Sequence, residues 1–252
     1  MTPVIEVVDL CKRFGGIIVA DHVHLALGAG EIVGLIGPNG AGKTSLFNLI
    51  SGVVASDAGS IYLNGTPVNG LPIHGRARLG LSRTWQTIRL FPSLTVLDNL
   101  LIAPRLYAGE SLTNLVLAHR SLGRARKELE ARAFQQLEKV RLADAAPRRP
   151  PELSHGKQKL VSLARALMND GNCLLLDEPM AGVEGPAYEA IKEVIRAEAC
   201  AGRAICIVEH NISFVKDLCA WAVFMFNGRI VSTGTVDTLI ENEELAELYF
   251  GR

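Results

Sequence analysis

Two runs in the sequence have the residue types and spacing for phosphate chemistry. The first, Gly37–Thr44, fits the pattern G-x-x-x-x-G-K-[ST]. Backbone N–H groups of such a loop can wrap phosphates, because glycine permits close approach and unusual dihedral angles. Lys43 would reach the β- and γ-phosphates of a nucleotide, and Thr44 would offer its hydroxyl to Mg²⁺. The run therefore predicts a phosphate-binding loop.

The second run is an apolar segment that ends in two acids, Asp177 and Glu178. A strand buried on both faces delivers an acid to the carboxyl edge of a sheet, beside a phosphate loop. Asp177 would hold Mg²⁺ through water, and Glu178 would face the γ-phosphate and orient the attacking water. The alternative is a buried strand with a solvated acidic end.

These residues need strands and helices to position them. An apolar run over 31–36 leads into the loop, and an apolar-periodic helix through Ile50 follows it. Strand, glycine loop and helix is the order that phosphate binding requires. Residues 4–10 and 19–27, separated by Gly15 and Gly16, predict an antiparallel β flap, and turn residues within 51–65 predict one more short β element.

The last hundred residues alternate helix and strand, which predicts βαβ units and a mainly parallel sheet. Residues 224–231 contain Asn227-Gly228 and predict a hairpin. The predicted elements are a helix at 154–168, a strand at 173–177, a helix at 186–201, a strand at 204–208 and a helix at 212–218.

Residues 95–142 have a helical character instead. Apolar side chains recur there at intervals of three and four, which is typical of an amphipathic helix; they are Leu122, Ala125, Leu129, Ala133, Leu137 and Val140. Pro147, Pro150 and Pro151 then close the segment. We expect a single α/β domain over 1–252, with a core of 1–87 and 153–252 and an inserted helical subdomain of 88–152.

Composition excludes several classes of protein. The chain has 252 residues, 48% hydrophobic and 21% charged, as folded proteins have, and 26 basic residues balance 26 acidic ones. That balance removes the broad positive field of a nucleic-acid binder. No apolar stretch approaches the ~20 residues of a membrane span, and the N-terminus lacks a basic signal region, so we expect a cytoplasmic protein. Five cysteines without a C-x-x-C pair argue against a disulfide framework and a zinc site.

The loop, the acidic strand end, Leu153–Gln158 and an isolated His210 together resemble the nucleotide-binding subunits of ATP-binding cassette (ABC) transporters, in order along nearly the whole chain. Within that family the sequence most resembles the branched-chain amino-acid importer ATPases, and urea-type importers are similar. The runs that carry the subgroup resemblance are Lys12–Gly16, Gly34–Gly40, Gln86–Pro92 and Val208–Asn211.

The resemblance implies a P-loop NTPase core and an ATP site. Phe14 would stack on adenine, with a core aromatic as the alternative. Gln86 would contact Mg²⁺ or its water shell, and His210 would hydrogen-bond the γ-phosphate and brace Glu178. The implied ATP-binding residues are Phe14, Gly37, Pro38, Asn39, Gly40, Ala41, Gly42, Lys43, Thr44, Ser45, Gln86, Ser154 and Gly156. The implied metal ligands are Thr44, Gln86 and Asp177, and the implied catalytic residues are Lys43, Glu178 and His210.

The signature motif departs from the family's common Leu-Ser-Gly-Gly-Gln, because His155 replaces the first Gly and Lys157 replaces Gln. Ser154 and Gly156 would cap the γ-phosphate of ATP bound to the opposite subunit, at a helix N-terminus that favours an anion. Ser154 also fits a helix N-cap. Glu184 stands where many members of the family have Asp.

The resemblance also implies partners. One copy would be incomplete, so function would need a head-to-tail pair, either a homodimer or a heterodimer with a paralogue. Permeases would be separate polypeptides, a solute-binding protein would act indirectly, and the chain would lie peripherally at the cytoplasmic face of the membrane. We expect permease docking between core and helical subdomain, near 86–100, through Leu90, Phe91 and Leu94. Core packing of these three side chains is the alternative.

Two other functions compete. A soluble ABC ATPase acting on DNA or ribosomes usually has long coiled coils or two cassettes, and neither is visible here. The arginines within 120–132 alternate with Glu128 and Glu130, which favours a solvated helix face over nucleic-acid binding. A small-molecule P-loop kinase gives no reason for the motif at 154–157.

Overall fold

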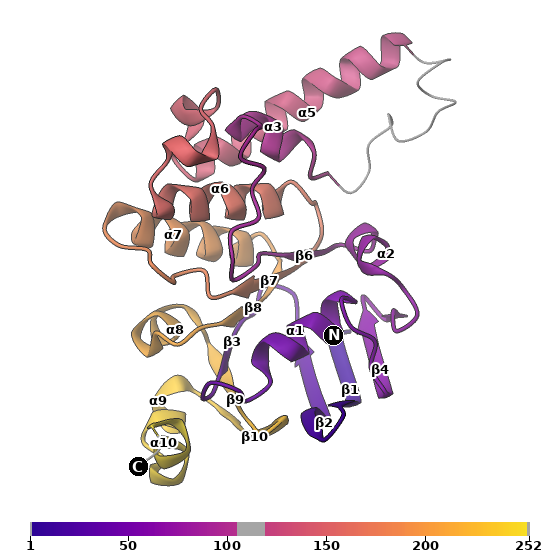
Figure 1. The fold of residues 1–252 in the computed structure, drawn as a ribbon, viewed down its shortest axis with the longest axis vertical. Helices are drawn as coiled ribbons and strands as arrows, with labels where there is room; N and C mark the ends of the chain where they lie inside the picture. The colour runs from indigo at the N-terminus through magenta and orange to yellow at the C-terminus, as the bar shows by residue number, and fades with distance from the viewer. Residues whose placement is uncertain (1, 105–118, 251–252) are drawn as a thin grey trace. The chain divides into compact units, whose positions relative to one another are not determined.

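The structure is a computed structural model that describes residues 2–104 and 119–250. Contacts within the chain divide it into two units (Figure 1). The core unit comprises Met1–Gln86, Gly171–Ala181 and Ile195–Arg252, and the helical unit comprises Thr87–Asp170 and Gly182–Val194.

A six-stranded sheet in the order β10-β9-β3-β8-β7-β6 forms the centre of the core unit. All neighbouring pairs from β9 to β6 are parallel, and only β10 runs antiparallel to β9. The mainly parallel sheet predicted from the sequence is therefore confirmed. Its strands are β3 (Ile32–Ile36), β6 (Leu81–Arg83), β7 (Cys173–Asp177), β8 (Ala204–Val208), β9 (Trp221–Phe226) and β10 (Arg229–Gly234).

The strands β3, β7 and β8 are buried at every position, so both of their faces are covered. Alternate side chains such as Leu35 and Leu175 share one hydrophobic cluster with Phe47 of α1 (Lys43–Ser51). On the other face, a Cβ added to Gly34 would lie 2.5 Å from Val215 Cγ1 of α8 (Ile212–Leu218). Burial on both faces explains why these strands read as continuous apolar runs.

A second sheet is entirely antiparallel, in the order β2-β1-β4-β5, and confirms the predicted β flap. Its strands are β1 (Ile5–Phe14), β2 (Ile17–Leu27), β4 (Ala58–Leu63) and β5 (Thr66–Pro67). The helices α2 (Ile73–Arg78), α9 (Val236–Ile240) and α10 (Glu243–Phe250) complete the unit. The predicted hairpin joins β9 to β10, and its two turn residues have the positive φ angles of a type I′ turn, 47° at Asn227 and 81° at Gly228.

The helical unit contains α3 (Val96–Leu101), α5 (His119–Lys139), α6 (His155–Leu167) and the first part of α7 (Pro186–Cys200), with short turns at Ala143–Ala145 and Pro150–Glu152. In and just after α5, Ala133, Leu137 and Val140 are fully buried, as the predicted amphipathic face requires. The side chains of Arg120 and Leu122, which the sequence also placed in this helix, lie outside the described residues.

The helical unit extends beyond the expected 88–152, because it includes α6 and residues 182–194. Helix α6 contacts α3 and α5, and its buried residues include Leu160, Leu163 and Leu167. A helix that the alternating pattern assigned to the core thus groups with the helical unit. No helix within the described residues is both long and apolar enough to cross a membrane.

Candidate functional site

The predicted phosphate loop joins β3 to α1, and its glycines are required by the backbone. Gly37, Gly40 and Gly42 have φ angles of 146°, 80° and 107°. A Cβ would lie 2.1 Å from Met225 O if added to Gly37, and 2.5 Å from Val19 O if added to Gly42. These two positions admit no side chain. At Gly40, by contrast, a Cβ would meet nothing within 4 Å, so the loop is open there.

Lys43 is the first residue of α1, and its side chain folds back onto the loop before the helix. Its Nζ donates hydrogen bonds to Gly37 O at 2.7 Å and to Pro38 O at 2.8 Å. Burial lowers the pKa of Lys43, and the negative charges of Glu178 and Asp177 oppose that shift. The first turn of α1 contains no acidic residue, so the positive end of the helix is not neutralised by a side chain of its own. This end of α1 can receive a phosphate.

Strand order explains how Glu178 gains two polar neighbours. β7 lies between β8 and β6, and the three parallel strands end at the same edge of the sheet. Glu178 follows β7, His210 follows β8 and Gln86 follows β6. Gln86 Nε2 donates to Glu178 Oε2 at 2.9 Å, and His210 Nε2 lies 3.3 Å from Glu178 Oε1. Glu178 and His210, two of the three residues that the resemblance implies are catalytic, thus lie together with Gln86, an implied metal ligand, in the core unit.

Glu178 itself has a strained backbone. Its φ of 47° lies in the left-handed region, which costs a residue other than glycine roughly 1–3 kcal/mol. Its N–H donates to Val208 O of β8 at 2.9 Å and holds it at the sheet edge. Strain of this kind concentrates at functional sites.

Asp177 has the properties of a metal ligand. It is 1% exposed, and its Oδ2 accepts a hydrogen bond from Arg83 Nη2 at 2.8 Å. Its Oδ1 is buried without a hydrogen-bond partner among the described residues. A buried carboxylate oxygen left over in this way fits a divalent cation, and the oxygens of Asp177, Thr44 and Gln86 are of the kind that Mg²⁺ prefers.

Sequence reasoning missed Arg83, whose side chain is 5% exposed. Besides Asp177, its guanidinium binds Asn48 Oδ1 and Ser51 Oγ of α1, each at 2.8 Å. It also lies over the ring of Trp85, 4.3 Å from the centroid. Arg83 therefore ties the acidic strand end to the helix that follows the phosphate loop. No signal in the sequence identified it, because Ser82 and Thr84 on either side of Arg83 are polar as well.

Replacing Arg83 with methionine is expected to lower the free energy of unfolding by about 3–5 kcal/mol, because it leaves Asp177 buried without its cation. Denaturant unfolding in the absence of nucleotide measures this. Arg229→Met is the matched control, since Arg229 forms a 2.6 Å pair with Asp21 at an exposed position and such pairs contribute about 0–1 kcal/mol. Equal losses in the two variants would contradict this account of Arg83.

The signature residues lie in the helical unit. Ser154 is the N-cap residue of α6, but its side chain makes no capping hydrogen bond and is exposed. The hydroxyl of Ser154 therefore accepts no hydrogen bond from the first backbone N–H groups of α6. A Cβ at Gly156 would lie 3.1 Å from Ala187 Cβ, and His155 Nδ1 lies 3.3 Å from Gly182 O. The side chains of Lys157 and Glu184 are exposed.

Phe14 is not a core aromatic. It is the last residue of β1, before the turn to β2, and 49% of its surface is exposed. Lys12 Nζ lies 5.2 Å from its ring centroid. An exposed ring is available for stacking on a planar ligand.

The five cysteines are free thiols, and three of them are buried. Cys11, Asp21 and His22 lie close enough to share an ion. However, Asp21 is paired with Arg229, and His22 Nδ1 lies 2.5 Å from Asp9 Oδ1. Asp21 and His22 therefore already have protein partners, and the cluster needs no metal ion to explain it.

Known proteins are similar to this chain over nearly its whole length. LivG of Escherichia coli, a "High-affinity branched-chain amino acid transport ATP-binding protein", is 34% identical over 99% of this chain and 98% of its own length. LptB of the same species, a "Lipopolysaccharide export system ATP-binding protein", is 32% identical over 96% of this chain and 95% of its own length. The ADP conformation of MJ1267, "an ATP-binding cassette of an ABC transporter", superposes over 100% of both chains with a TM-score of 0.84 and 27% identity.

The family match covers most of the site residues described above. Residues 20–181 match the sequence pattern of the family described as "ABC transporter", and that span includes the phosphate loop, the signature motif, Asp177 at the end of β7 and Glu178 after it. With a nucleotide-type loop, an acidic strand end and full-length relatives in agreement, this chain belongs to the ABC transporter family and is one of its ATP-hydrolysing cassettes.

Proposed function

We propose that this chain is the ATP-hydrolysing motor of an importer for branched-chain or other amino acids, working with Mg²⁺ and with separate permease subunits. The observation that carries the hydrolytic part is the contact of Glu178 with both Gln86 and His210 at one sheet edge. The loop that ends in Lys43 follows β3 of the same sheet. The likeness to LivG supports the amino-acid cargo.

Each site residue then has a defined task. Lys43 and the loop amides bind the β- and γ-phosphates, with Pro38, Asn39, Ala41, Ser45 and the three glycines forming the cradle. Thr44, Gln86 and Asp177 would hold Mg²⁺, which would neutralise phosphate charge. Glu178 orients the attacking water and takes its proton, while His210 braces Glu178 and hydrogen-bonds the γ-phosphate. Phe14 stacks on adenine.

A second copy of the fold completes each site. Ser154 and Gly156 would bind the γ-phosphate held by the opposite subunit, using the N-terminal end of α6 and the exposed hydroxyl of Ser154. The opposite subunit is a second copy of this chain or a paralogue. Binding of ATP favours the closed pair and hydrolysis releases it, which is a ligand-driven shift between two states.

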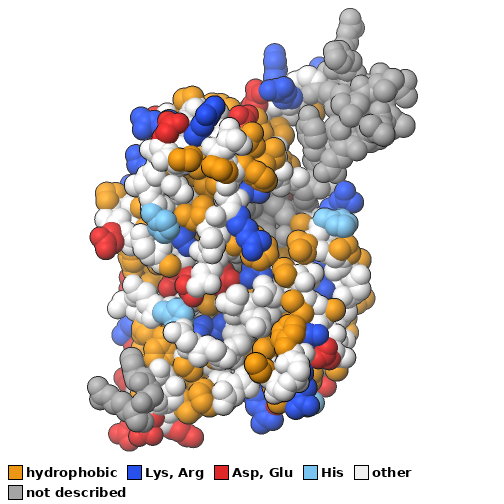
Figure 2. Space-filling model, in the orientation of Figure 1, with side chains coloured by type: hydrophobic (Ala, Val, Ile, Leu, Met, Phe, Trp, Pro, Cys, Tyr) orange, Lys and Arg blue, Asp and Glu red, His pale blue; other side chains and the backbone are white. Residues whose placement is uncertain are grey.

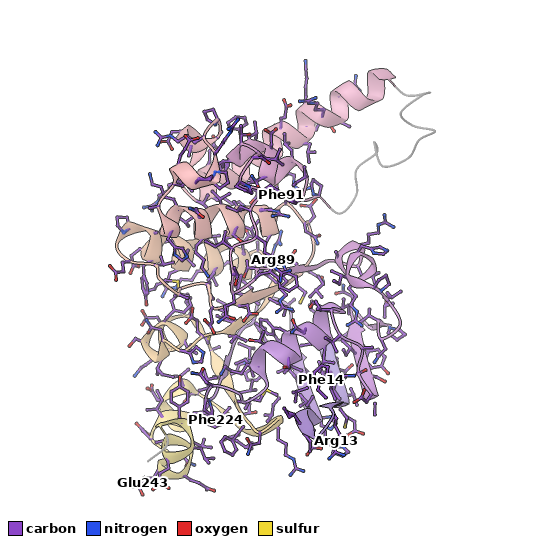
Figure 3. The ribbon with its side chains drawn as sticks, viewed as in Figure 1. Arg13, Phe14, Arg89, Phe91, Phe224 and Glu243 are labelled. Atoms are coloured by element: carbon purple, nitrogen blue, oxygen red, sulfur yellow. The ribbon has the colours of Figure 1, made fainter. Side chains whose placement is uncertain are left out.

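The permease contact lies in the loop before α3. Phe91, which is labelled in Figure 3, is 47% exposed. Leu90 and Leu94 are half-buried. Asn99 holds Phe91 in place, because its side chain accepts from Phe91 N at 2.8 Å and donates to Phe91 O at 3.0 Å. An exposed aromatic on a fixed backbone suits the centre of a protein interface. The chain would thus attach peripherally to the cytoplasmic face of the membrane, and a solute-binding protein would reach it only through the permease.

Leu90→Asp is expected to abolish coupling of ATP hydrolysis to transport while nucleotide binding stays within twofold, because a charge disrupts an apolar docking surface. The measurement compares uptake by the reconstituted transporter with the ATP affinity of the isolated chain. Val231→Asp is the control, since Val231 is 45% exposed on β10 of the core unit. Unchanged coupling in Leu90→Asp would refute the docking surface.

Export is a second candidate, favoured by the likeness to LptB. Uptake of labelled leucine, labelled urea and labelled amides in a strain lacking this chain separates the importers from each other. Loss of leucine uptake supports the proposal, whereas normal uptake of all three solutes with a defective envelope supports export.

Acidic and basic side chains are interspersed on the face in Figure 2, which gives no support to a nucleic-acid surface there.

A further inference from the structure

Glu209 is a buried acid that the roles above do not use. It follows β8, is 4% exposed and directly precedes His210. Its Oε1 accepts a hydrogen bond from Met180 N at 2.7 Å, and its Oε2 accepts from His210 N at 3.0 Å and from Asn211 N at 3.4 Å. One carboxylate therefore joins the segment after Glu178 to the segment that carries His210.

The chemistry of these contacts requires an ionised carboxylate. All three partners are backbone N–H donors, and a carboxylate offers two acceptor oxygens and no donor. A glutamine of the same shape has only one acceptor oxygen, and its NH₂ would face an N–H. Burial raises the pKa of Glu209, and the three backbone hydrogen bonds oppose this shift by favouring the charged form.

The two joined segments set the geometry of hydrolysis. Met180 lies two residues after Glu178, whose strained φ of 47° depends on the turn that follows, where Ala181 N donates to Glu178 O at 3.3 Å. At the other end, the backbone of His210 determines whether its imidazole reaches Glu178 Oε1, now 3.3 Å away. A shift of either segment would separate the pair.

We propose that Glu209 is a positioning residue for ATP hydrolysis, clamping the backbone of Met180 and His210 so that Glu178 and His210 stay aligned. The proposal rests on the function proposed above for Glu178 and His210. Within the described residues, the hydrogen bonds of the Glu209 side chain go to Met180, His210 and Asn211 and not to the phosphate loop, which follows β3. Loss of the clamp should therefore slow turnover and leave nucleotide affinity intact.

Glu209→Gln tests this directly against Glu198→Gln. Glu198 is also 4% exposed in the core unit, where its Oε2 lies 2.8 Å from Arg203 Nε, so it controls for the general cost of neutralising a buried acid. We expect kcat to fall about 10- to 100-fold in Glu209→Gln, since a misplacement near 1 Å can cost that much, with the Kd for ATP within twofold. Glu198→Gln should keep kcat within twofold. A folded Glu209→Gln chain with normal kcat would overturn the proposal.

A double-mutant cycle with His210→Ala separates positioning from a merely structural role. If Glu209 acts by keeping Glu178 aligned with His210, Glu209→Gln costs much less in the His210→Ala background than in the wild type, because that background has no pair left to align, whereas independent effects multiply. Multiplied losses would overturn the proposal. Glu209→Asp serves if the glutamine variant does not fold: it retains the charge but is too short for Met180 N, and kcat should again fall, whereas full activity would count against the clamp.

The controls also distinguish the two proposals. Normal hydrolysis by His210→Ala would refute the role of His210 in the proposed function itself. Impaired His210→Ala together with normal Glu209→Gln would refute only the clamp.

Discussion

Lys43→Ala is expected to weaken ATP binding at least about 100-fold, equivalent to roughly 2.7 kcal/mol, and to remove hydrolysis. Nζ of Lys43 already lies among the loop carbonyls, 2.7 Å from Gly37 O and 2.8 Å from Pro38 O, so the cation is placed where phosphates would enter the loop. Alanine removes that charge without altering the glycines that shape the backbone. Calorimetric titration with ATP and Mg²⁺ gives the affinity, and phosphate release gives the rate.

Lys216→Ala is the control for loss of a positive charge. Lys216 is exposed and pairs with Asp237, so both affinity and rate should stay within twofold. Wild-type affinity in Lys43→Ala, in a chain shown to be folded, would remove the loop from the proposed site.

Glu178→Gln is expected to reduce hydrolysis by about 10²- to 10⁴-fold, which is the range for loss of a general base, while ATP stays bound. The amide cannot take a proton from water. It would also present an NH₂ group toward Gln86 Nε2 or His210 Nε2, the two groups that now lie 2.9 and 3.3 Å from the carboxylate. With ATP retained, the closed pair should accumulate.

Single-turnover hydrolysis and the mass of the nucleotide-bound species by light scattering measure the two effects. Glu241→Gln, at an exposed position, provides the control for a lost surface charge. Brisk turnover by Glu178→Gln would remove Glu178 from its role, and a second acid would have to be sought.

The central strands could be predicted because burial on both faces left only apolar residues in them. β7, β8 and α8 begin and end at the residues expected, and the loop at 37–44 follows a fully buried β3. Loop glycines were also predictable, since Gly37 and Gly42 occupy positions where any Cβ would meet a backbone carbonyl.

Contacts across the sheet edge were not predictable from pattern alone. β6 has three residues, of which Ser82 and Arg83 are polar, so no periodicity identifies it. Without β6, neither the buried pair of Arg83 with Asp177 nor the position of Gln86 beside Glu178 can be deduced. The same holds for Glu209, because its bond to Met180 N joins two residues that are 29 positions apart and follow different strands.

The sequence also did not predict that α6 groups with the helical unit. Helix-strand alternation from residue 154 onward gives no information on which helices pack on the sheet. Side-chain packing of α6 with α3 and α5 decides it.

Titration of the purified wild-type chain with ATP, and in parallel with AMP, tests the central claim most directly, because the glycine loop and Lys43 are assigned to the β- and γ-phosphates. With Mg²⁺ present, the expected result is one ATP bound per chain and no detectable binding of AMP at the same concentration. Absence of ATP binding, or AMP binding as tightly as ATP, would contradict the assignment of this chain's site.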